Sequence, residues 1–561
     1  MNCKSSHKVV GFQVHDSKRP YNISFTPAVM SPPNNGHLQA RLSGLNMVAM
    51  AFAILNTWIA LAGSIGLVLP SGGSVSLLYG FVFCVLCNLA LTASLGELAS
   101  IWPTAGGQYH FVYALCTNKW KRVMSFWVGW TNIVGWLVVV TVQGFFAAQF
   151  VCAASVVASN GRFVVTQWNT YLIFLAILTF ATVGNIWGNR ILGKWNDFAS
   201  KETQTSKFLL LVKSSHHEVF WSILGVIIIS IILLSLHDKT NADYVFTSFN
   251  NKTGWPDSIA WVLGLLQSAL SLIGFDVILH MMEEMPNPSR DAPRAMIYSI
   301  VVGGVTGFAF ILVMLFCFTD PTTVLATNTG MPIVELMLQA TRNPAATCVM
   351  TIMLAVCFIN GCTASTTSAS RLLYSMARDN GILFPKCFSH ITPGHNVPTN
   401  TILMCYGFNI LFGTLYLGPT VAFGAYIASC TIFLNVSYAF PIIALLVRGR
   451  DILSQHQVPN APFRLGRCGY GINLIAALFV SVTSIFFCFP VALPVTSDNM
   501  NYVLIVVAIF IIIVESYWLA YGHRFQVEGI QVILGQHDSV TANNAYELGL
   551  DFGTTDQKTS E

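Results

Sequence analysis

Charged side chains are scarce in this chain of 561 residues. Asp, Glu, Lys and Arg together account for 9% of the sequence, whereas hydrophobic residues account for 54%. A typical soluble domain contains about 25% charged residues, so an assembly of soluble domains is excluded. There is also no basic tract with interleaved aromatic residues, and this absence excludes nucleic acid as a partner.

Signatures of catalysis are absent as well. The sequence contains no phosphate-binding glycine loop, no pair of histidines at a metal-binding spacing and no nucleophile elbow. These absences argue against a membrane-embedded transferase, and we expect no cofactor and no metal. Most of the 14 cysteines lie inside apolar runs, as Cys84 and Cys87 do, which favours buried small side chains over disulfides or metal ligands.

Long apolar runs dominate the sequence. A membrane-spanning helix needs about 20 mainly apolar residues, and the sequence predicts an all-α membrane protein with twelve such helices. The N-terminus lacks the apolar core of a signal peptide, so we expect insertion to begin at the first internal span. The expected spans are 45–69, 77–101, 123–157, 164–187, 220–236, 259–281, 295–318, 345–370, 398–417, 420–447, 470–489 and 500–521.

The distribution of Lys and Arg supports this count, because both accumulate in cytoplasmic loops. With the N-terminus inside, 24 of the 28 fall on the cytoplasmic side. The other four are Arg162, Lys239, Lys252 and Arg342. We therefore expect cytoplasmic tails at residues 1–44 and 522–561. Asn251, in the sequence Asn-Lys-Thr, is then an outer glycosylation acceptor, whereas Asn22, in Asn-Ile-Ser, is cytoplasmic and unmodified.

Two of the expected spans carry polar residues near their middle. The first contains Asn56, Thr57 and Trp58, and the sixth contains Gly274-Phe275-Asp276. The two spans are five apart, which is the spacing of the discontinuous helices in transporters built from inverted repeats. Breaks at these places would turn backbone groups and the Asp276 carboxylate towards a cavity.

Asp276 has two interpretations. A charge in the middle of a bilayer is expensive, so it marks either a binding site or a structural hydrogen bond to a neighbouring helix. His280 is either a proton relay or a packed neutral imidazole. Glu283 and Glu284 lie near the inner interface, where they form either a gate or a solvated helix end.

Polar and aromatic residues elsewhere are further candidates. Ser365 and Thr366, in a Ser/Thr-rich stretch of the eighth span, either line an ion or substrate site or bond back to their own helix. Three tryptophans of the third span, Trp127, Trp130 and Trp136, are candidates for a cation–π wall. Interface anchoring is the competing role, and it fits Trp127 best. The Gly-rich loop 103–109 is either an inner hinge or a simple turn.

Three longer stretches carry a resemblance to a known family. Residues 94–115 (SLGELASIWPTAGGQYHFVYAL), 274–296 (GFDVILHMMEEMPNPSRDAPRAM) and 368–400 (SASRLLYSMARDNGILFPKCFSHITPGHNVPTN) resemble the fungal amino acid/choline permeases. These permeases belong to the amino acid–polyamine–organocation superfamily, and the similarity runs from about residue 40 to residue 525.

The resemblance implies a fold of the bacterial leucine-transporter type. Helices 1–5 (45–236) and 6–10 (259–447) would form two inverted repeats, with helices 11 and 12 (470–521) at the periphery. It also implies uptake of a small amine-bearing solute such as choline, GABA or an amino acid, coupled to protons, across the plasma membrane.

Carried over to this sequence, the family's substrate site would involve residues of the first and sixth helices. These residues are Asn56, Thr57, Trp58, Gly274, Phe275 and Asp276. Coupling of the ion or proton would involve Asp276, His280, Ser365 and Thr366.

The sequence departs from the family in two places. The wider superfamily often has Gly-Ser-Gly at the first break, where this chain has Asn-Thr-Trp, and an aromatic residue with a carboxylate suits a cationic head group. Residues 200–219 form a polar insert, either a regulatory loop or an error in the gene model. A nutrient receptor that keeps this fold without transport is the alternative function.

Overall fold

The computed structural model describes most of the chain after its N-terminal tail. The described residues are 43–199, 216–236, 238–319, 324, 326–392, 397–418, 422–456, 462–496, 499–527, 529–531 and 534–535. They belong to the second of two compact units, Leu38–Glu561; the first unit is Met1–His37. Most of the insert at 200–219 and the acceptor Asn22 lie outside the described residues.

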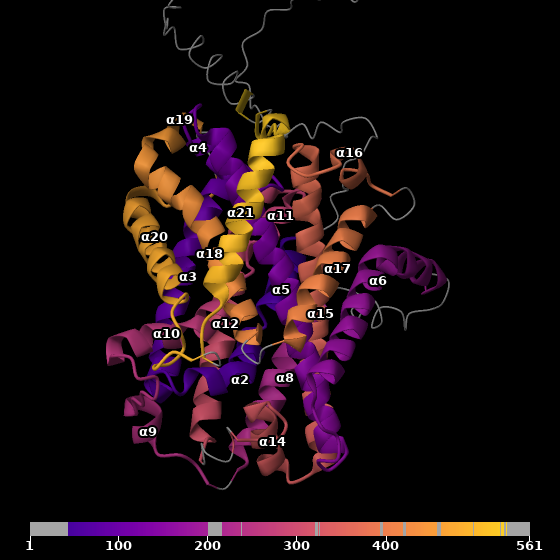
Figure 1. Ribbon diagram of the computed structural model, residues 1–561, viewed down its shortest axis with the longest axis vertical. Helices are drawn as coiled ribbons and strands as arrows, with labels where there is room; N and C mark the ends of the chain where they lie inside the picture. Colours follow the sequence, from indigo (N-terminus) through magenta and orange to yellow (C-terminus); the bar gives the residue numbers. More distant parts are fainter. Residues whose placement is uncertain are drawn as a thin grey trace, which may run out of the picture. The chain divides into compact units, whose positions relative to one another are not determined.

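Helices make up the regular structure of the described residues, apart from two isolated bridges between single residues (Figure 1). The first half contains α1 (Gly44–Leu55), α2 (Thr57–Val68), α3 (Gly73–Ile101), α4 (Gln108–Leu115), α5 (Lys121–Ala158), α6 (Gln167–Ala199), α8 (His216–Leu234) and α9 (Ala242–Thr247). The middle contains α10 (Asp257–Leu270), α11 (Val277–His280), α12 (Pro288–Phe316), α14 (Pro332–Thr341), α15 (Pro344–Arg378) and α16 (Pro385–Phe388). The last part contains α17 (Thr399–Gly413), α18 (Ala422–Arg448), α19 (Asp451–His456), α20 (Gly469–Phe486) and α21 (Val503–Tyr521).

Ten helical segments of the described chain are long and apolar enough to cross a membrane. They coincide with ten of the expected spans, and α1 with α2 counts as one of them. Two shorter apolar helices, Ser222–Leu234 and Asp257–Leu270, fall within the fifth and sixth expected spans. The prediction of a multi-pass helical membrane protein is therefore confirmed, whereas the count of twelve spans stays a prediction.

The helices form a bundle around α5. In the most apolar 18-residue stretch of α5, 89% is buried inside the protein. In the corresponding stretch of α21, 17% is buried. α5 packs along α15 and α18, and it also touches α4 and α6. The long apolar sequence of α5 is thus the core of the bundle, and α21 presents most of its side chains to the surroundings.

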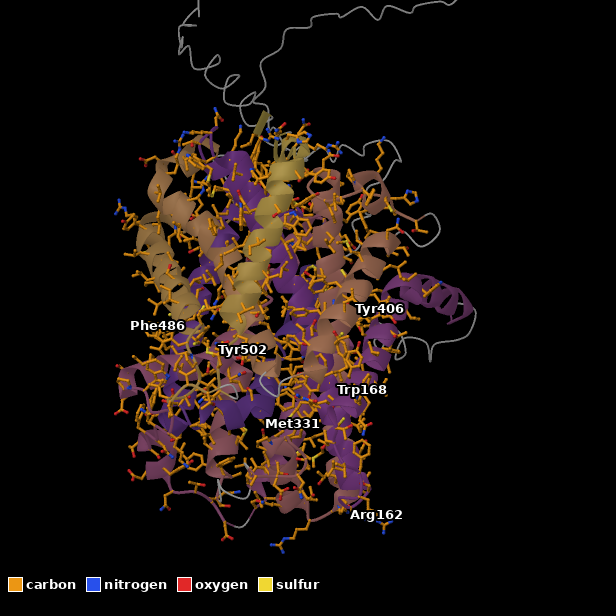
Figure 2. The ribbon with its side chains drawn as sticks, in the orientation of Figure 1. Arg162, Trp168, Met331, Tyr406, Phe486 and Tyr502 are labelled. Atoms are coloured by element: carbon orange, nitrogen blue, oxygen red, sulfur yellow. The ribbon has the colours of Figure 1, made fainter. Side chains whose placement is uncertain are left out.

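The bundle has two distinct ends (Figure 1). We call the end that carries α4, α16 and α19 the α4 end, and the end that carries α9 and α14 the α9 end. Polar side-chain atoms gather at both, and Arg162 lies at the α9 end (Figure 2). The α4 end carries buried ion pairs, such as the one in which Arg450 donates to both carboxylate oxygens of Glu97 at 2.8 and 2.9 Å. Glu97 is therefore held in a structural ion pair.

The first and sixth expected spans are both interrupted. α1 ends at Leu55, and Asn56 adopts a left-handed conformation with φ 42° before α2 begins. Asn tolerates this conformation better than most residues. The sixth span consists of α10, a segment without helix, and the short α11, with Gly274 at φ 107° in between.

The two breaks touch each other. The Thr57 hydroxyl donates to the Ser271 carbonyl at 2.9 Å, which joins α2 to the broken sixth span. A Cβ atom on Gly274 would lie 2.7 Å from the Ile54 side chain, so the close approach of the breaks requires glycine there. The interruption of both helices, predicted from their polar centres, is present in the structure.

A C-terminal segment packs across the α4 end. The side chains of Phe525, Val527 and Ile530 are fully buried there. The Arg122 guanidinium, at the start of α5, donates to the carbonyls of Gly522, His523 and Phe525 at 3.0 to 3.2 Å. One arginine therefore holds three carbonyls of this segment in place.

Arg122→Ala should release this segment. Each hydrogen bond from a charged donor contributes about 1.5–3 kcal/mol, so local opening should become at least about tenfold more frequent. Limited proteolysis of the purified full-length chain would measure it as faster cleavage after residue 521. Lys119→Ala, at an exposed neighbouring position, is the matched control. Equal cleavage rates for the two variants would contradict the prediction.

Candidate functional site

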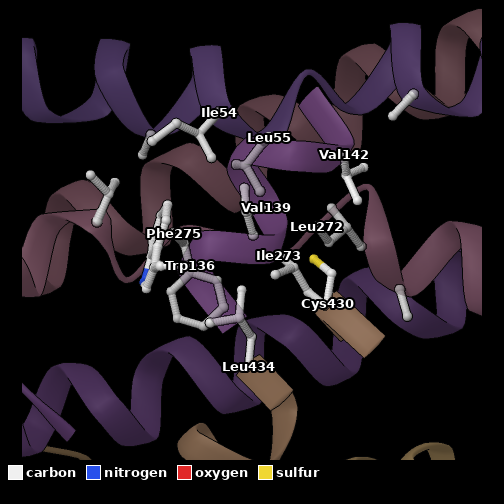
Figure 3. Packing of buried hydrophobic residues seen from close by; sticks show 14 of the residues in the cluster. Ile54, Leu55, Trp136, Val139, Val142, Leu272, Ile273, Phe275, Cys430 and Leu434 are labelled. Atoms are coloured by element: carbon white, nitrogen blue, oxygen red, sulfur yellow. The ribbon is translucent and has the colours of Figure 1, made fainter. Parts of the chain in front are cut away.

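A small central cavity lies where the two breaks meet. Its volume is about 20 Å³, which is the room that one water molecule needs. The wall is formed by both breaks together with α5, α15 and α18. Figure 3 shows several of the lining side chains, among them Ile54, Val139 and Cys430. Among the lining residues are Ile54, Leu55, Val139, Gln143, Ile273 and Cys430. Gln143 supplies the one amide among the described lining residues, and the other lining side chains are apolar.

A larger cavity of about 440 Å³ lies between this site and the α9 end. Gln267 of α10 and Ala428 of α18 line the larger cavity, whereas Leu270 and Cys430 line the central one. These residues are two or three positions apart on the same two helices, which is less than one helical turn. A thin apolar layer therefore separates the central cavity from the larger one.

Asp276 lies beside the sixth-span break and is fully buried. Its Oδ1 accepts a hydrogen bond from the Tyr438 hydroxyl at 2.5 Å. Its Oδ2 accepts from the Gln108 amide at 2.8 Å and from the Trp136 indole at 3.1 Å. The His280 Nε2 atom lies 3.2 Å from the same oxygen. Donors from α4, α5 and α18 thus compensate the carboxylate for the loss of water.

Further polar groups extend this network towards the Gly-rich loop. The Asn132 amide donates to Gln108 Oε1 at 2.9 Å and lies 3.3 Å from His280 Nε2. His280 Nδ1 lies 3.3 Å from the Ala105 carbonyl, within the loop 103–109. The Asp276 network therefore lies on the α4 side of the central cavity. Asp276 itself is absent from the described cavity wall.

The residues of the first break have different environments. Asn56 lies at the break itself, and its amide donates to the Cys357 carbonyl at 3.2 Å. Trp58 points away from Asp276: its indole donates to Ser222 of α8 at 2.8 Å, and its ring packs edge-on against Phe310 at 5.0 Å. The structure thus brings Asn56 and Thr57 to the breaks and places Trp58 between α8 and α12.

Gly274 and Phe275 lie directly at the sixth-span break. The Phe275 ring is fully buried and packs 5.0 Å from the ring of Tyr438. Figure 3 shows the Phe275 ring beside Trp136. Phe275 and Trp136 therefore lie next to the Asp276 carboxylate. The aromatic neighbour of the carboxylate in the third span is Trp136, which the sequence offered only as one of several candidates.

Glu283 and Glu284 form ion pairs towards the α4 end. Glu283 pairs with Arg378 at 2.5 Å, and Glu284 pairs with Arg371 at 3.2 Å.

Ser365 and Thr366 are buried on α15. The Thr366 hydroxyl bonds back to the Cys362 carbonyl at 2.8 Å, whereas the Ser365 hydroxyl has no partner among the described residues. Asn251 lies before α10, and its amide donates to the Trp255 carbonyl at 2.7 Å and to Asp257 at 2.9 Å.

Sequence reasoning missed Gln108, Tyr438 and Gln143. Gln108 belongs to the Gly-rich loop, so its position next to a candidate hinge was a usable signal. Tyr438 and Gln143 sit in apolar runs without a distinguishing pattern. As for metals, the described residues contain no group of three His, Cys, Asp or Glu side chains that could hold an ion.

Comparison with known proteins identifies this architecture. The family model for amino acid permeases matches residues 45–511, which is most of the chain and includes both breaks. The chain belongs to the amino acid permease family. Its members are transporters and not enzymes, and membership implies the fold of the bacterial leucine-transporter type.

Several curated permeases are similar over most of their length. The chain is 29% identical to a choline transporter of Saccharomyces cerevisiae over 515 residues, which cover 91% of this chain and 87% of that protein. It is 28% identical to an amino-acid permease of Arabidopsis thaliana, with 86% and 92% covered. It is 23% identical to a polyamine transporter of Saccharomyces cerevisiae, with 86% and 75% covered. This permease is thus a transmembrane transporter of the amino acid, choline and polyamine group.

Tyr438→Phe should destabilise the protein, because it removes a donor from a buried carboxylate. The expected loss is about 1.5–3 kcal/mol of unfolding free energy, as for other hydrogen bonds to charged groups. Thermal denaturation in detergent would show it as a lower Tm. Tyr426→Phe, on the same helix, removes a hydrogen bond to the neutral Phe412 carbonyl and should cost less. The prediction fails if the control loses as much stability as Tyr438→Phe.

Proposed function

We propose that this permease imports a small amine-bearing solute, such as choline, GABA or an amino acid, by alternating access. The observation that carries the proposal is the meeting of two broken helices at a cavity in the centre of the bundle. Twelve spans in two inverted repeats of five, with two peripheral helices, accommodate this arrangement. The solute is imported across the plasma membrane. With both termini cytoplasmic, the α4 end of the bundle faces the inside of the cell.

The two ends of the bundle support this direction. The larger cavity of about 440 Å³ approaches the central cavity from the α9 end, and a thin apolar layer separates the two. Towards the α4 end the way is closed by the Asp276 network and by the ion pairs of Glu283 and Glu284. In this arrangement the solute enters from the α9 end, and the two ion pairs form the cytoplasmic gate.

Asp276 supplies the negative charge of the site. A carboxylate beside the cavity attracts a cationic solute through Coulomb forces, and the neighbouring Trp136 adds cation–π attraction. In the arrangement described, Tyr438, Gln108 and Trp136 already donate to it. The solute therefore has to replace a donor, or a proton has to neutralise the carboxylate, before the helices around it can move.

Proton coupling is assigned to Asp276 together with His280. The two side chains lie 3.2 Å apart and are both buried, so a proton can be shared between them. Ser365, whose buried hydroxyl has no partner among the described residues, is the further candidate for an ion or solute contact. Thr366 is a weaker candidate because its hydroxyl is used within α15.

Asp276→Asn tests the proposed function. The amide keeps the shape of the side chain and loses its charge, so uptake of labelled solute should fall to background while surface expression stays intact. The assay is concentrative uptake in a transport-deficient cell, with exposed Asp451→Asn as the control. Wild-type uptake by Asp276→Asn would remove Asp276 from the mechanism. A nutrient receptor without transport would show no concentrative uptake even in the wild type.

Asn251 is proposed as a glycosylation site on the outer side. Its Nδ2 donates to Trp255 and Asp257 in the folded loop, so a glycan on this nitrogen would replace one of these two hydrogen bonds. Asn251→Gln should then remove a glycosidase-sensitive mobility shift on a gel, whereas Asn22→Gln should change nothing. A shift that survives in Asn251→Gln would contradict the assignment.

A further inference from the structure

Gln143 of α5 has one buried polar atom that the protein does not satisfy. Its Nε2 donates to the Ile54 carbonyl at 2.6 Å, in the last turn before the first break. This bond fixes the orientation of the amide. Its Oε1 has no hydrogen-bond partner among the described residues, although the side chain is 7% exposed. A buried acceptor left unpaired costs about 1–3 kcal/mol, so its partner is either a water molecule in the central cavity or a donor on a ligand that displaces this water.

A second acceptor lies beside the first. The Asn56 N–H makes the last regular helical bond of α1, to the Phe52 carbonyl. Because the helix breaks there, no backbone donor to the Ala53 carbonyl is found among the described residues. A Cβ atom placed on Gly361 of α15 would lie 2.8 Å from Asn56 Nδ2, 2.8 Å from Gln143 Oε1 and 3.0 Å from the Ala53 carbonyl oxygen. The two oxygens and the Asn56 amide nitrogen therefore lie close together beside the Gly361 backbone, where any larger residue would displace them.

This region lies between two cavities. Gln143 lines the central cavity, and Ala53 lines a neighbouring cavity of about 310 Å³ between α1, α8 and α15. The surrounding wall of the central cavity is apolar, with Val139, Val142 and Phe358 among its members. A ligand that suits the site thus carries N–H or O–H donors at one point and carbon elsewhere.

We propose that Gln143 is a specificity-determining residue that accepts an N–H hydrogen bond from the solute's ammonium group, with the Ala53 carbonyl as a second acceptor. The inference rests on the proposed function and narrows its solute class to primary or secondary ammonium compounds. A trimethylammonium group has no N–H, so it would bury both oxygens without partners. Sites built around hydrogen bonds reject analogues that lack the donor far more strongly than apolar pockets reject a change in size.

The test compares matched pairs of amines on three forms of the full-length protein. Ethanolamine and choline differ only in the three N-methyl groups, as do GABA and its N-trimethyl derivative. Uptake and mutual competition are measured in a transport-deficient cell for the wild type, Gln143→Met and Gln143→Glu. Ligand-induced shifts of Tm in purified protein provide a second readout that does not depend on transport.

The wild type should prefer the primary amine of each pair. Gln143→Met has a similar length and no acceptor, so its affinity for primary amines should fall about 10- to 100-fold, as expected for one lost hydrogen bond to a charged group. Its affinity for the trimethyl analogues should change less than about threefold. Gln143→Glu keeps an acceptor oxygen and should retain the preference for primary amines.

Other outcomes overturn the inference or the function separately. If Gln143→Met and Gln143→Glu weaken both members of each pair equally, Gln143 acts only through its bond to Ile54, and the specificity role is wrong. A wild type that prefers the trimethyl member also overturns it. A wild type at the cell surface that takes up no member, while purified protein still prefers primary amines, overturns the transport function and leaves the binding inference standing.

Discussion

Backbone groups that lose their helical partners inside a bilayer must find others, and this constraint organises the centre of the molecule. The Ile54 carbonyl receives the Gln143 amide, and the Ser271 carbonyl receives the Thr57 hydroxyl. The Asn56 amide, at the first break, donates to the Cys357 carbonyl of α15. Each partner comes from a helix other than the one that supplies the carbonyl. The breaks therefore bind α5 and α15 to the broken spans, and they persist only while those helices stay in place.

The buried charge of Asp276 also needs hydrogen-bond partners, and leaving it unpaired would cost more than leaving a neutral carbonyl unpaired. A carboxylate away from water is tolerated when several donors surround it, and here the donors come from α4, α5 and α18 through Gln108, Trp136 and Tyr438. Neutralising the charge would weaken all three bonds together. The packing of three helices thus depends on the charge of one side chain. This dependence gives protonation, or an arriving cation, a physical means to change the relative stability of two conformations.

The sequence predicted the parts of the site that depend on a single segment. The breaks could be predicted because Asn56 and Gly274 are polar or flexible residues inside apolar runs, and Asp276 because its charge is exceptional there. The partners of these groups were not predictable, because they depend on how each helix is rotated about its own axis. Trp58 illustrates this: it sits next to Thr57 in sequence, yet its indole meets Ser222 of α8 instead of the carboxylate. Tyr438 is the converse case, a residue in an ordinary apolar helix that rotation brings to Asp276.

The layers that close the central cavity on its two sides differ in kind. Towards the α9 end the layer is apolar and less than a turn of α10 and α18 thick, with no ion pair among the described residues that line the two cavities. Towards the α4 end, opening must separate the Asp276 network, the pairs of Glu283 and Glu284 and the contacts of the C-terminal segment. A ligand shifts such an equilibrium only by its differential affinity for the two states. Because the α4 side has many polar bonds to break at once, the conformation closed on that side is favoured, and an occupant that replaces some of those bonds would shift the equilibrium towards opening.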